Sequence, residues 1–156
     1  MSNPVTITAP EGLPFIETTR EFDAPVEALF RAHEDPELVT QWLGPNGYEM
    51  KVERWDFVPQ GGYRYIHTDP DGNDWAFNGT FHSVRPDFAV QTFEFEGYPD
   101  VVAIETMAFE DLGEGRSRLV IHSTYPSVEA RDGMVQSGME TGLTEGYARL
   151  DALLAA

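Results

Sequence analysis

Between Tyr48 and Tyr125 the chain consists of short runs rich in aromatic and β-branched residues, separated at close intervals by Gly, Pro and Asp clusters. Such runs are typical of β-strands, and the clusters between them are typical of tight hairpin turns. A similar run precedes this region. We therefore predict seven antiparallel strands, at residues 13–22, 48–58, 62–68, 74–84, 89–96, 101–111 and 116–125.

Three segments have their apolar residues at helical spacing instead. Pro25 and Pro36 are suited to the first position of a helix, and we predict two short helices that end near His33 and at Gly44. A longer helix is predicted over residues 134–154. Its apolar row consists of Val135, Met139, Leu143, Tyr147, Leu150, Leu153 and Leu154.

The long helix also carries Gly138, Gly142 and Gly146 on one face, since four residues span slightly more than one helical turn. A glycine inside a helix costs about 0.5–1 kcal/mol relative to alanine. Two explanations stay open: close packing of the helix on the sheet, or clearance for a ligand. If Gly142 and Gly146 faced solvent, the ligand explanation would fail.

An antiparallel sheet must bury one of its faces, and the long helix is the only predicted element large enough to cover it. A curved sheet around one helix leaves space between them, and this space is the candidate site. The expected fold is therefore α+β, with a seven-stranded sheet around a C-terminal helix. We expect one domain over residues 1–156, in which residues 1–12 form a poorly ordered N-terminal segment.

Strict alternation assigns side chains to the two faces of each strand. In residues 74–84 the inward set is Trp75, Phe77, Gly79 and Phe81. In residues 101–111, Glu105 shares its side with Met107 and Phe109. The strand around Phe93 and Phe95 is ambiguous, because either alternating set could face inward.

An inward Glu105 among apolar neighbours requires a hydrogen bond, a partner charge or a bound proton. One explanation is a structural pair with Arg64 or Tyr65. The other is a general acid or base with a raised pKa. Our hypothesis is that Glu105 is the polar anchor of a pocket.

Charge and composition exclude several classes of function. Ten Lys and Arg residues against 27 Asp and Glu residues give a net charge of −17, which repels nucleic acids and anionic membranes. There is no cysteine, no secretion signal and no long apolar run, so a soluble cytoplasmic protein is expected. His33, His67, His82 and His122 are dispersed, and we expect no metal and no other cofactor.

Six segments carry a family resemblance: FDAPVEALFRAHEDPELVTQWLGP (22–45), QGGYR (60–64), DPDG (69–72), FEFEG (93–97), SVEARDGMVQSGMETG (127–142) and RLDALL (149–154). With the element order, they resemble the START-like, helix-grip superfamily, which contains Bet v 1-type and polyketide-cyclase-like proteins. Within it, the chain is similar to the branch named after the C-terminal domain of the activator of the Hsp90 ATPase. This resemblance implies a deep apolar cavity between sheet and helix, but no catalytic signature.

The expected function is binding of a small hydrophobic or aromatic molecule in that cavity. The predicted ligand-binding residues are Trp42, Tyr65, Trp75, Phe77, Phe81, Glu105, Met107, Met139, Gly142, Leu143 and Gly146. One alternative is a chaperone partner, as in the co-chaperone that names the branch. Another is a cyclase or hydratase that uses Glu105 or His122. A monomer and a homodimer, in which Tyr147 could contribute to the contact, both stay open.

Overall fold

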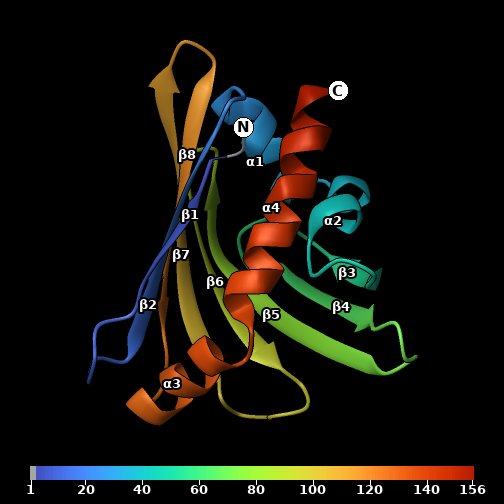
Figure 1. Cartoon of the computed structure of the whole chain (residues 1–156), viewed down its shortest axis with the longest axis vertical. Coiled ribbons are helices and arrows are strands. Elements are labelled where there is room, and N and C mark those ends of the chain that lie inside the picture. Colours follow the sequence, from blue (N-terminus) through green and yellow to red (C-terminus); the bar gives the residue numbers. More distant parts are fainter. Residues whose placement is uncertain (1–2) are drawn as a thin grey trace.

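The computed structural model describes residues 3–156, which form one curved antiparallel sheet and four helices (Figure 1). The strands are β1 (Val5–Thr8), β2 (Phe15–Phe22), β3 (Glu49–Trp55), β4 (Gly62–Thr68), β5 (Asp74–Arg85), β6 (Phe88–Phe95), β7 (Ala103–Gly113) and β8 (Arg116–Thr124). The helices are α1 (Val26–Glu34), α2 (Pro36–Trp42), α3 (Val128–Gln136) and α4 (Met139–Ala155). The strand order is β1-β2-β8-β7-β6-β5-β4-β3.

The sheet has eight strands, so the predicted count of seven was wrong. The additional strand is β1, which pairs with β2 in the register Val5 to Arg20. It lies within residues 1–12, where we expected little regular structure. Four residues at a sheet edge give only a short alternation, and here the inward residues Val5 and Ile7 are themselves only half-buried. The sequence pattern of β1 is correspondingly weak.

The predicted long helix is two helices with a break at Gly138. This glycine has φ 87°, in the left-handed region, and it precedes the first residue of α4. The preceding helix, α3, begins after Ser127, whose side chain accepts a hydrogen bond from the Ala130 N–H at 3.0 Å. A glycine in the left-handed region is a common helix terminator. The prediction of one uninterrupted helix over residues 134–154 was therefore wrong, although α4 covers most of it.

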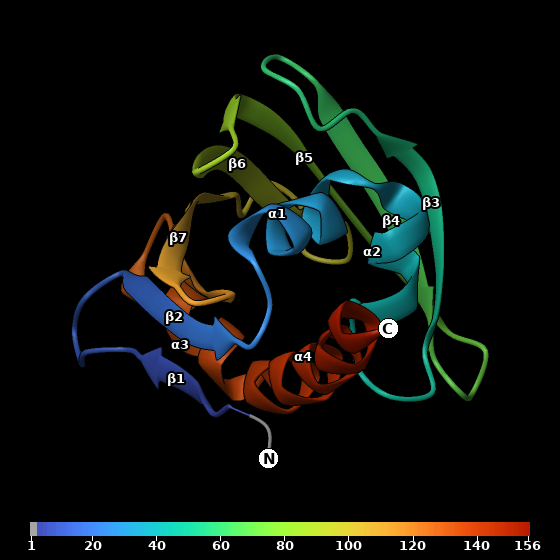
Figure 2. The same ribbon diagram turned by 90° about the horizontal axis from the view of Figure 1, so that it is seen from above.

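The sheet curves around α1, α2 and α4, which lie on its concave side (Figure 2). Below α1, α2 and the last turns of α4 lies a fully buried core, in the upper part of Figure 1. Trp42 links several elements of this core. Its ring nitrogen donates to the Ala32 carbonyl oxygen at 3.0 Å, and its ring stacks on Tyr147 with centroids 5.9 Å apart.

A second, smaller apolar cluster lies beneath α3, in the lower part of Figure 1. Its buried members are Ile16, Ala103 and Tyr125, and half-buried Phe93 and Met139 pack against it. Helix α3 covers this end of the sheet only in part. The concave face therefore has two halves: an upper half under α1 and α2, and a lower half beside α3 and the first turns of α4.

The face assignments from alternation hold for Phe81, Met107 and Phe109, whereas Trp75, assigned to the inward side with Phe81, is 40% exposed. Phe81, Met107 and Phe109 are all buried on the concave side. The ambiguous strand, β6, turns Phe93 and Phe95 to the same side, where their ring centroids lie 5.5 and 5.2 Å from that of Phe77.

Candidate functional site

Glu105 lies in a row of polar side chains that crosses three strands of the concave face. Pairing of β6, β7 and β8 places Gln91 opposite Glu105 and Glu105 opposite Ser123. Gln91 Nε2 donates to one carboxylate oxygen at 2.8 Å, and the Ser123 hydroxyl donates to the other at 2.7 Å. Each carboxylate oxygen of Glu105 therefore has one neutral hydrogen-bond donor.

No cation pairs with Glu105 among the described residues. Arg64, one of its suggested partners, lies on the convex face, where it binds Glu96 at 2.8 Å and also contacts Glu53. The suggested Arg64–Glu105 pair was therefore wrong. Burial raises the pKa of Glu105, and the hydrogen bonds from Ser123 and Gln91 offset part of that effect. The protein thus encloses an acidic side chain whose described partners are both neutral.

Four tyrosines surround this carboxylate. Burial raises the pKa of Tyr63, Tyr65, Tyr125 and Tyr147, and the negative charge of Glu105 raises each pKa further. The Tyr63 hydroxyl donates to the carbonyl oxygen of Thr92 at 2.7 Å. The Glu105 carboxyl group therefore interacts electrostatically with all four phenol groups in the interior.

The hydroxyls of Tyr65 and Tyr147 indicate an accessible space inside the protein. Neither hydroxyl has a hydrogen-bond partner in the described chain, although the two residues are only 7% and 2% exposed. In the described chain, the one side-chain polar atom that is both fully buried and without a partner is Nε2 of His67. The two tyrosine hydroxyls are therefore not fully buried, and each must touch accessible space. Glu105 is likewise enclosed but keeps part of its accessible surface.

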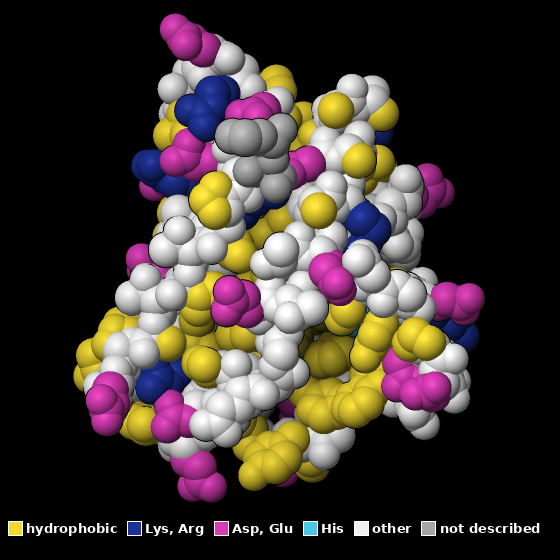
Figure 3. Space-filling view, in the orientation of Figure 1, with side chains coloured by type: hydrophobic (Ala, Val, Ile, Leu, Met, Phe, Trp, Pro, Cys, Tyr) yellow, Lys and Arg dark blue, Asp and Glu magenta, His cyan; other side chains and the backbone are white. Residues whose placement is uncertain are grey.

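The walls of this space are aromatic and apolar. Phe77 is half-buried and stacks on Tyr65 and Phe93, with centroids 5.2 and 5.5 Å apart. Half-buried Leu143 contributes from α4. Figure 3 shows a hollow with a hydrophobic floor beside the first turns of α4. From these observations we infer a space among Tyr65, Phe77, Glu105, Leu143 and Tyr147, which we call the Glu105 cavity.

The other predicted site residues lie elsewhere. Trp42, Phe81 and Met107 belong to the buried core. Trp75 is 40% exposed and stacks on Phe95 at the rim, with centroids 5.7 Å apart. Met139 packs beneath α3.

The two helix glycines face the segment between α2 and β3. A Cβ on Gly146 would lie 3.0 Å from the carbonyl oxygen of Trp42, and one on Gly142 would lie 3.6 Å from Pro45 Cγ. Gly146 is buried and Gly142 is half-buried, so neither faces solvent. Close packing thus accounts for Gly146, but the partner is this segment and not the sheet or a ligand.

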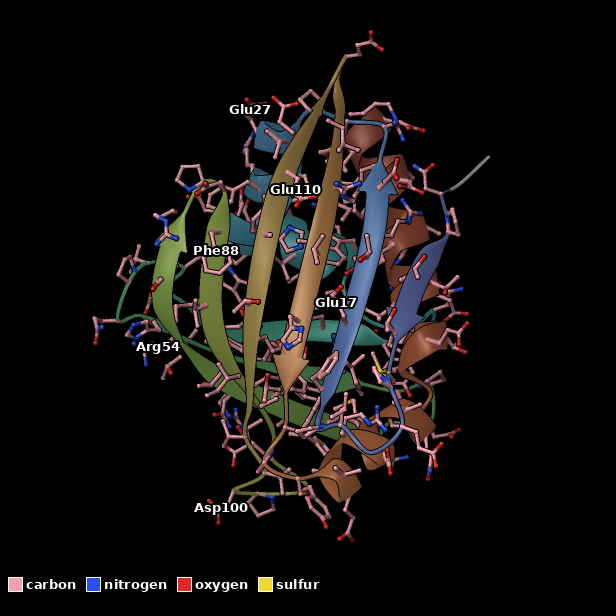
Figure 4. All side chains as sticks on the ribbon, turned by 90° about the vertical axis from the view of Figure 1, so that its left-hand side faces the viewer. Glu17, Glu27, Arg54, Phe88, Asp100 and Glu110 are labelled. Atoms are coloured by element: carbon pink, nitrogen blue, oxygen red, sulfur yellow. The ribbon has the colours of Figure 1, made fainter. Side chains whose placement is uncertain are left out.

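His122, the second proposed acid or base, lies on the convex face. Its Nδ1 is 3.3 Å from a carboxylate oxygen of Glu17, and its ring stacks on Phe15. Figure 4 views the outer face of the sheet and shows Glu17 on it. His122 and Glu105 are on opposite faces of the sheet, so His122 cannot act in the same cavity.

Sequence reasoning missed Gln91, Ser123 and Tyr147 as neighbours of Glu105. Alternation gives the face of a residue, but only the register between strands shows which residues are opposite. A β-bulge between Phe81 and Ser83 shifts that register within the sheet. The sequence feature that could have indicated Tyr147 as a neighbour of Glu105 is its position in the inward-facing apolar row of the last helix.

Two surface pockets lie away from this cavity. One, of about 390 Å³, lies between α1 and the turn from β5 to β6, and includes Phe30 and Pro86. The other, of about 210 Å³, is next to the end of α4 and includes Asp23 and Leu154. Neither contains a predicted site residue. None of the helices described is both long and apolar enough to span a membrane.

Residues 23–155 match the family described as Activator of Hsp90 ATPase homolog 1-like protein. The chain belongs to this family. The fold agrees, because solved structures of bacterial proteins superpose along nearly the whole chain. Comparison with curated proteins gave no match.

Three solved structures illustrate this similarity. A protein from Arthrobacter aurescens is 29% identical with a TM-score of 0.86, and the match covers 96% of this chain and 91% of that one. A protein from Mycobacterium smegmatis is 27% identical, with a TM-score of 0.87 and 98% of both chains covered. One from Rhodobacter sphaeroides is 26% identical, with a TM-score of 0.87 and coverages of 97% and 98%.

Proposed function

We propose that the protein binds a small, mainly aromatic or apolar molecule in the Glu105 cavity. The observation that carries this proposal is the pair of unpartnered hydroxyls, Tyr65 and Tyr147, next to an enclosed carboxylate. Because both hydroxyls touch accessible space and have no partner in the described chain, they are free to form hydrogen bonds to a bound molecule. Polar groups that converge on an apolar cavity are typical of ligand sites.

The aromatic walls support the same function. Phe77 and Phe93 stay half-buried on the concave side of the sheet, where burial of the remaining surface of each ring would stabilise the fold by roughly 1 kcal/mol. An aromatic ligand that stacked on Phe77 would cover this surface. Membership of the family and the curved sheet around α4 are consistent with this proposal.

A neutral aromatic probe, 2-naphthylmethanol, tests the proposal by isothermal titration calorimetry. Wild-type protein should bind it saturably. Leu143→Trp should weaken binding at least about tenfold, because the indole fills the space beside α4. Val135→Trp is the matched control, since Val135 is exposed on α3.

Thermal unfolding should show that both variants are folded. Absence of saturable binding to the wild-type protein would overturn the proposal. Equal binding by wild-type protein and Leu143→Trp would overturn the location of the site.

A further inference from the structure

The cavity contains an acidic group, Glu105, and no arginine of the described chain pairs with it. Glu105 forms no ion pair in the described chain. On the inner face of β2, the guanidinium of Arg20 binds both carboxylate oxygens of Asp151 at 2.6 Å. On α4, Arg149 is held by oxygen atoms of Asn46, Trp42 and Gly44. These cations are therefore already engaged.

The unused hydrogen-bonding capacity of the Glu105 carboxylate itself is that of an acceptor. A carboxylate can accept about four hydrogen bonds, and Glu105 accepts two, from Gln91 and Ser123. The hydroxyls of Tyr65 and Tyr147 have no hydrogen-bond partner in the described chain and can each donate one hydrogen bond and accept others. A ligand with several N–H donors would satisfy these groups better than a ligand with acceptors alone.

The aromatic walls also favour a positive charge. Tyr65, Phe77 and Phe93 form a continuous stack, and the faces of aromatic rings attract cations. A carboxylic acid would meet the opposite conditions. It would face Glu105 without a free cation, and the net charge of −17 would repel it on approach.

We propose that the ligand of the Glu105 cavity is a protonated amine carried on an aromatic or apolar body. Its ammonium group donates to the Glu105 carboxylate, and its body lies against Phe77 and Leu143. A charge-assisted hydrogen bond of this kind is about twice as strong as a neutral one. This inference rests on the proposed function, because it assumes that the cavity binds a small molecule.

Three probes with one ring system and different head groups test the charge preference: 2-naphthylmethylamine, 2-naphthylmethanol and 2-naphthoic acid. Calorimetry at pH 7.5 and fixed ionic strength should show that the amine binds at least about tenfold tighter than the alcohol. The acid should bind most weakly. In Glu105→Gln the amine should lose its advantage, while the affinity for the alcohol should stay within about threefold of wild type.

Glu110→Gln is the matched control for net charge. Glu110 is on the same strand, β7, but on the outer face, where it binds Arg118 at 2.6 Å (Figure 4). This variant removes one negative charge and should retain the preference for the amine. If Glu110→Gln lost the preference as Glu105→Gln does, long-range charge would explain it and the inference would be overturned.

The remaining outcomes separate the two proposals. If none of the three probes binds, the proposed function fails together with this inference. If the alcohol binds as tightly as the amine, or the acid binds best, only this inference is overturned.

Discussion

The two halves of the concave face differ in how completely the helices cover them. In the upper half, Phe22, Leu29 and Leu150 are at 0% exposure. In the lower half, Phe77 and Phe93 are only half-buried although they come from the same sheet and obey the same alternation. The exposure differs because α1 and α2 pack over the side chains of the upper half. The alternation along the strands therefore determines which face of the sheet is apolar, and the positions of the helices determine which part of that face is buried.

The halves also differ in how their polar groups are satisfied. In the upper half the Ser117 hydroxyl donates to the Ala24 carbonyl oxygen at 2.8 Å. Around the Glu105 cavity the hydroxyls of Tyr65 and Tyr147 have no hydrogen-bond partner and Glu105 has no counter-ion in the described chain. A surface that evolved only to be packed would satisfy such groups. This contrast is the physical basis for assigning binding to the lower half.

The largest expected effect is on stability, from matched leucine deletions in the two halves. Leu29→Ala should lower the free energy of unfolding by about 3–5 kcal/mol, because it leaves a cavity in a fully buried core. Leu143→Ala should cost roughly 1–2 kcal/mol, since this side chain is already half-exposed. Urea unfolding measures both. Equal losses would mean that the lower half is ordinary core.

A pH effect of intermediate size is expected from two histidines. Burial lowers the pKa of His33 to about 4; for His67, burial and then the charge of Arg149 lower the pKa to about 4. Both are neutral in the folded protein, so the unfolded chain binds more protons between pH 6.5 and 4. Stability should therefore fall as the pH falls through this window, by roughly 3 kcal/mol per histidine at its lower end. Above pH 6.5 neither group contributes.

Denaturant titrations at pH 7 and 4.5 check this expectation. His67→Gln should show a smaller stability loss between these pH values than wild-type protein, whatever its stability at pH 7. The control is His82→Gln, because His82 is exposed on the convex face. An unchanged loss in His67→Gln would show that this imidazole titrates normally.

The smallest expected effects come from the glycines of α4. Gly146→Ala should destabilise by about 1 kcal/mol, because its Cβ would lie 3.0 Å from the Trp42 carbonyl oxygen. Gly142→Ala should instead stabilise by about 0.5–1 kcal/mol through helix propensity, since Pro45 is at an ordinary contact distance. Thermal unfolding distinguishes the two signs. Destabilisation by both variants would mean that this face of α4 packs more tightly throughout.

Much of the fold could be predicted from the sequence because its elements have strong local signals. The proline positions anticipated the starts of α1 and α2, and turn residues separated β3 to β8 close to their observed ends. The break at Gly138 was missed because its residues fit a helical period on both sides. Only the left-handed φ of this glycine separates α3 from α4.

The candidate site was less predictable, for reasons of register and packing. Alternation correctly turned Glu105 inward, but its neighbours Gln91 and Ser123 depend on the pairing of three strands. Burial of Trp42 and Met107 in the core depends on where α1 and α2 lie. Apolar periodicity cannot distinguish a side chain that lines a cavity from one that fills a core.

The most direct test of the central claim is an NMR titration of methyl-labelled protein with 2-naphthylmethanol. Saturable shifts are expected at Leu143, which is half-buried and borders the Glu105 cavity, and little change at Leu29 and Leu150, which are fully buried. This result would place a ligand where the concave face is incompletely covered. No saturable shift at Leu143, or shifts centred on Val26 in the pocket beside α1, would contradict the account.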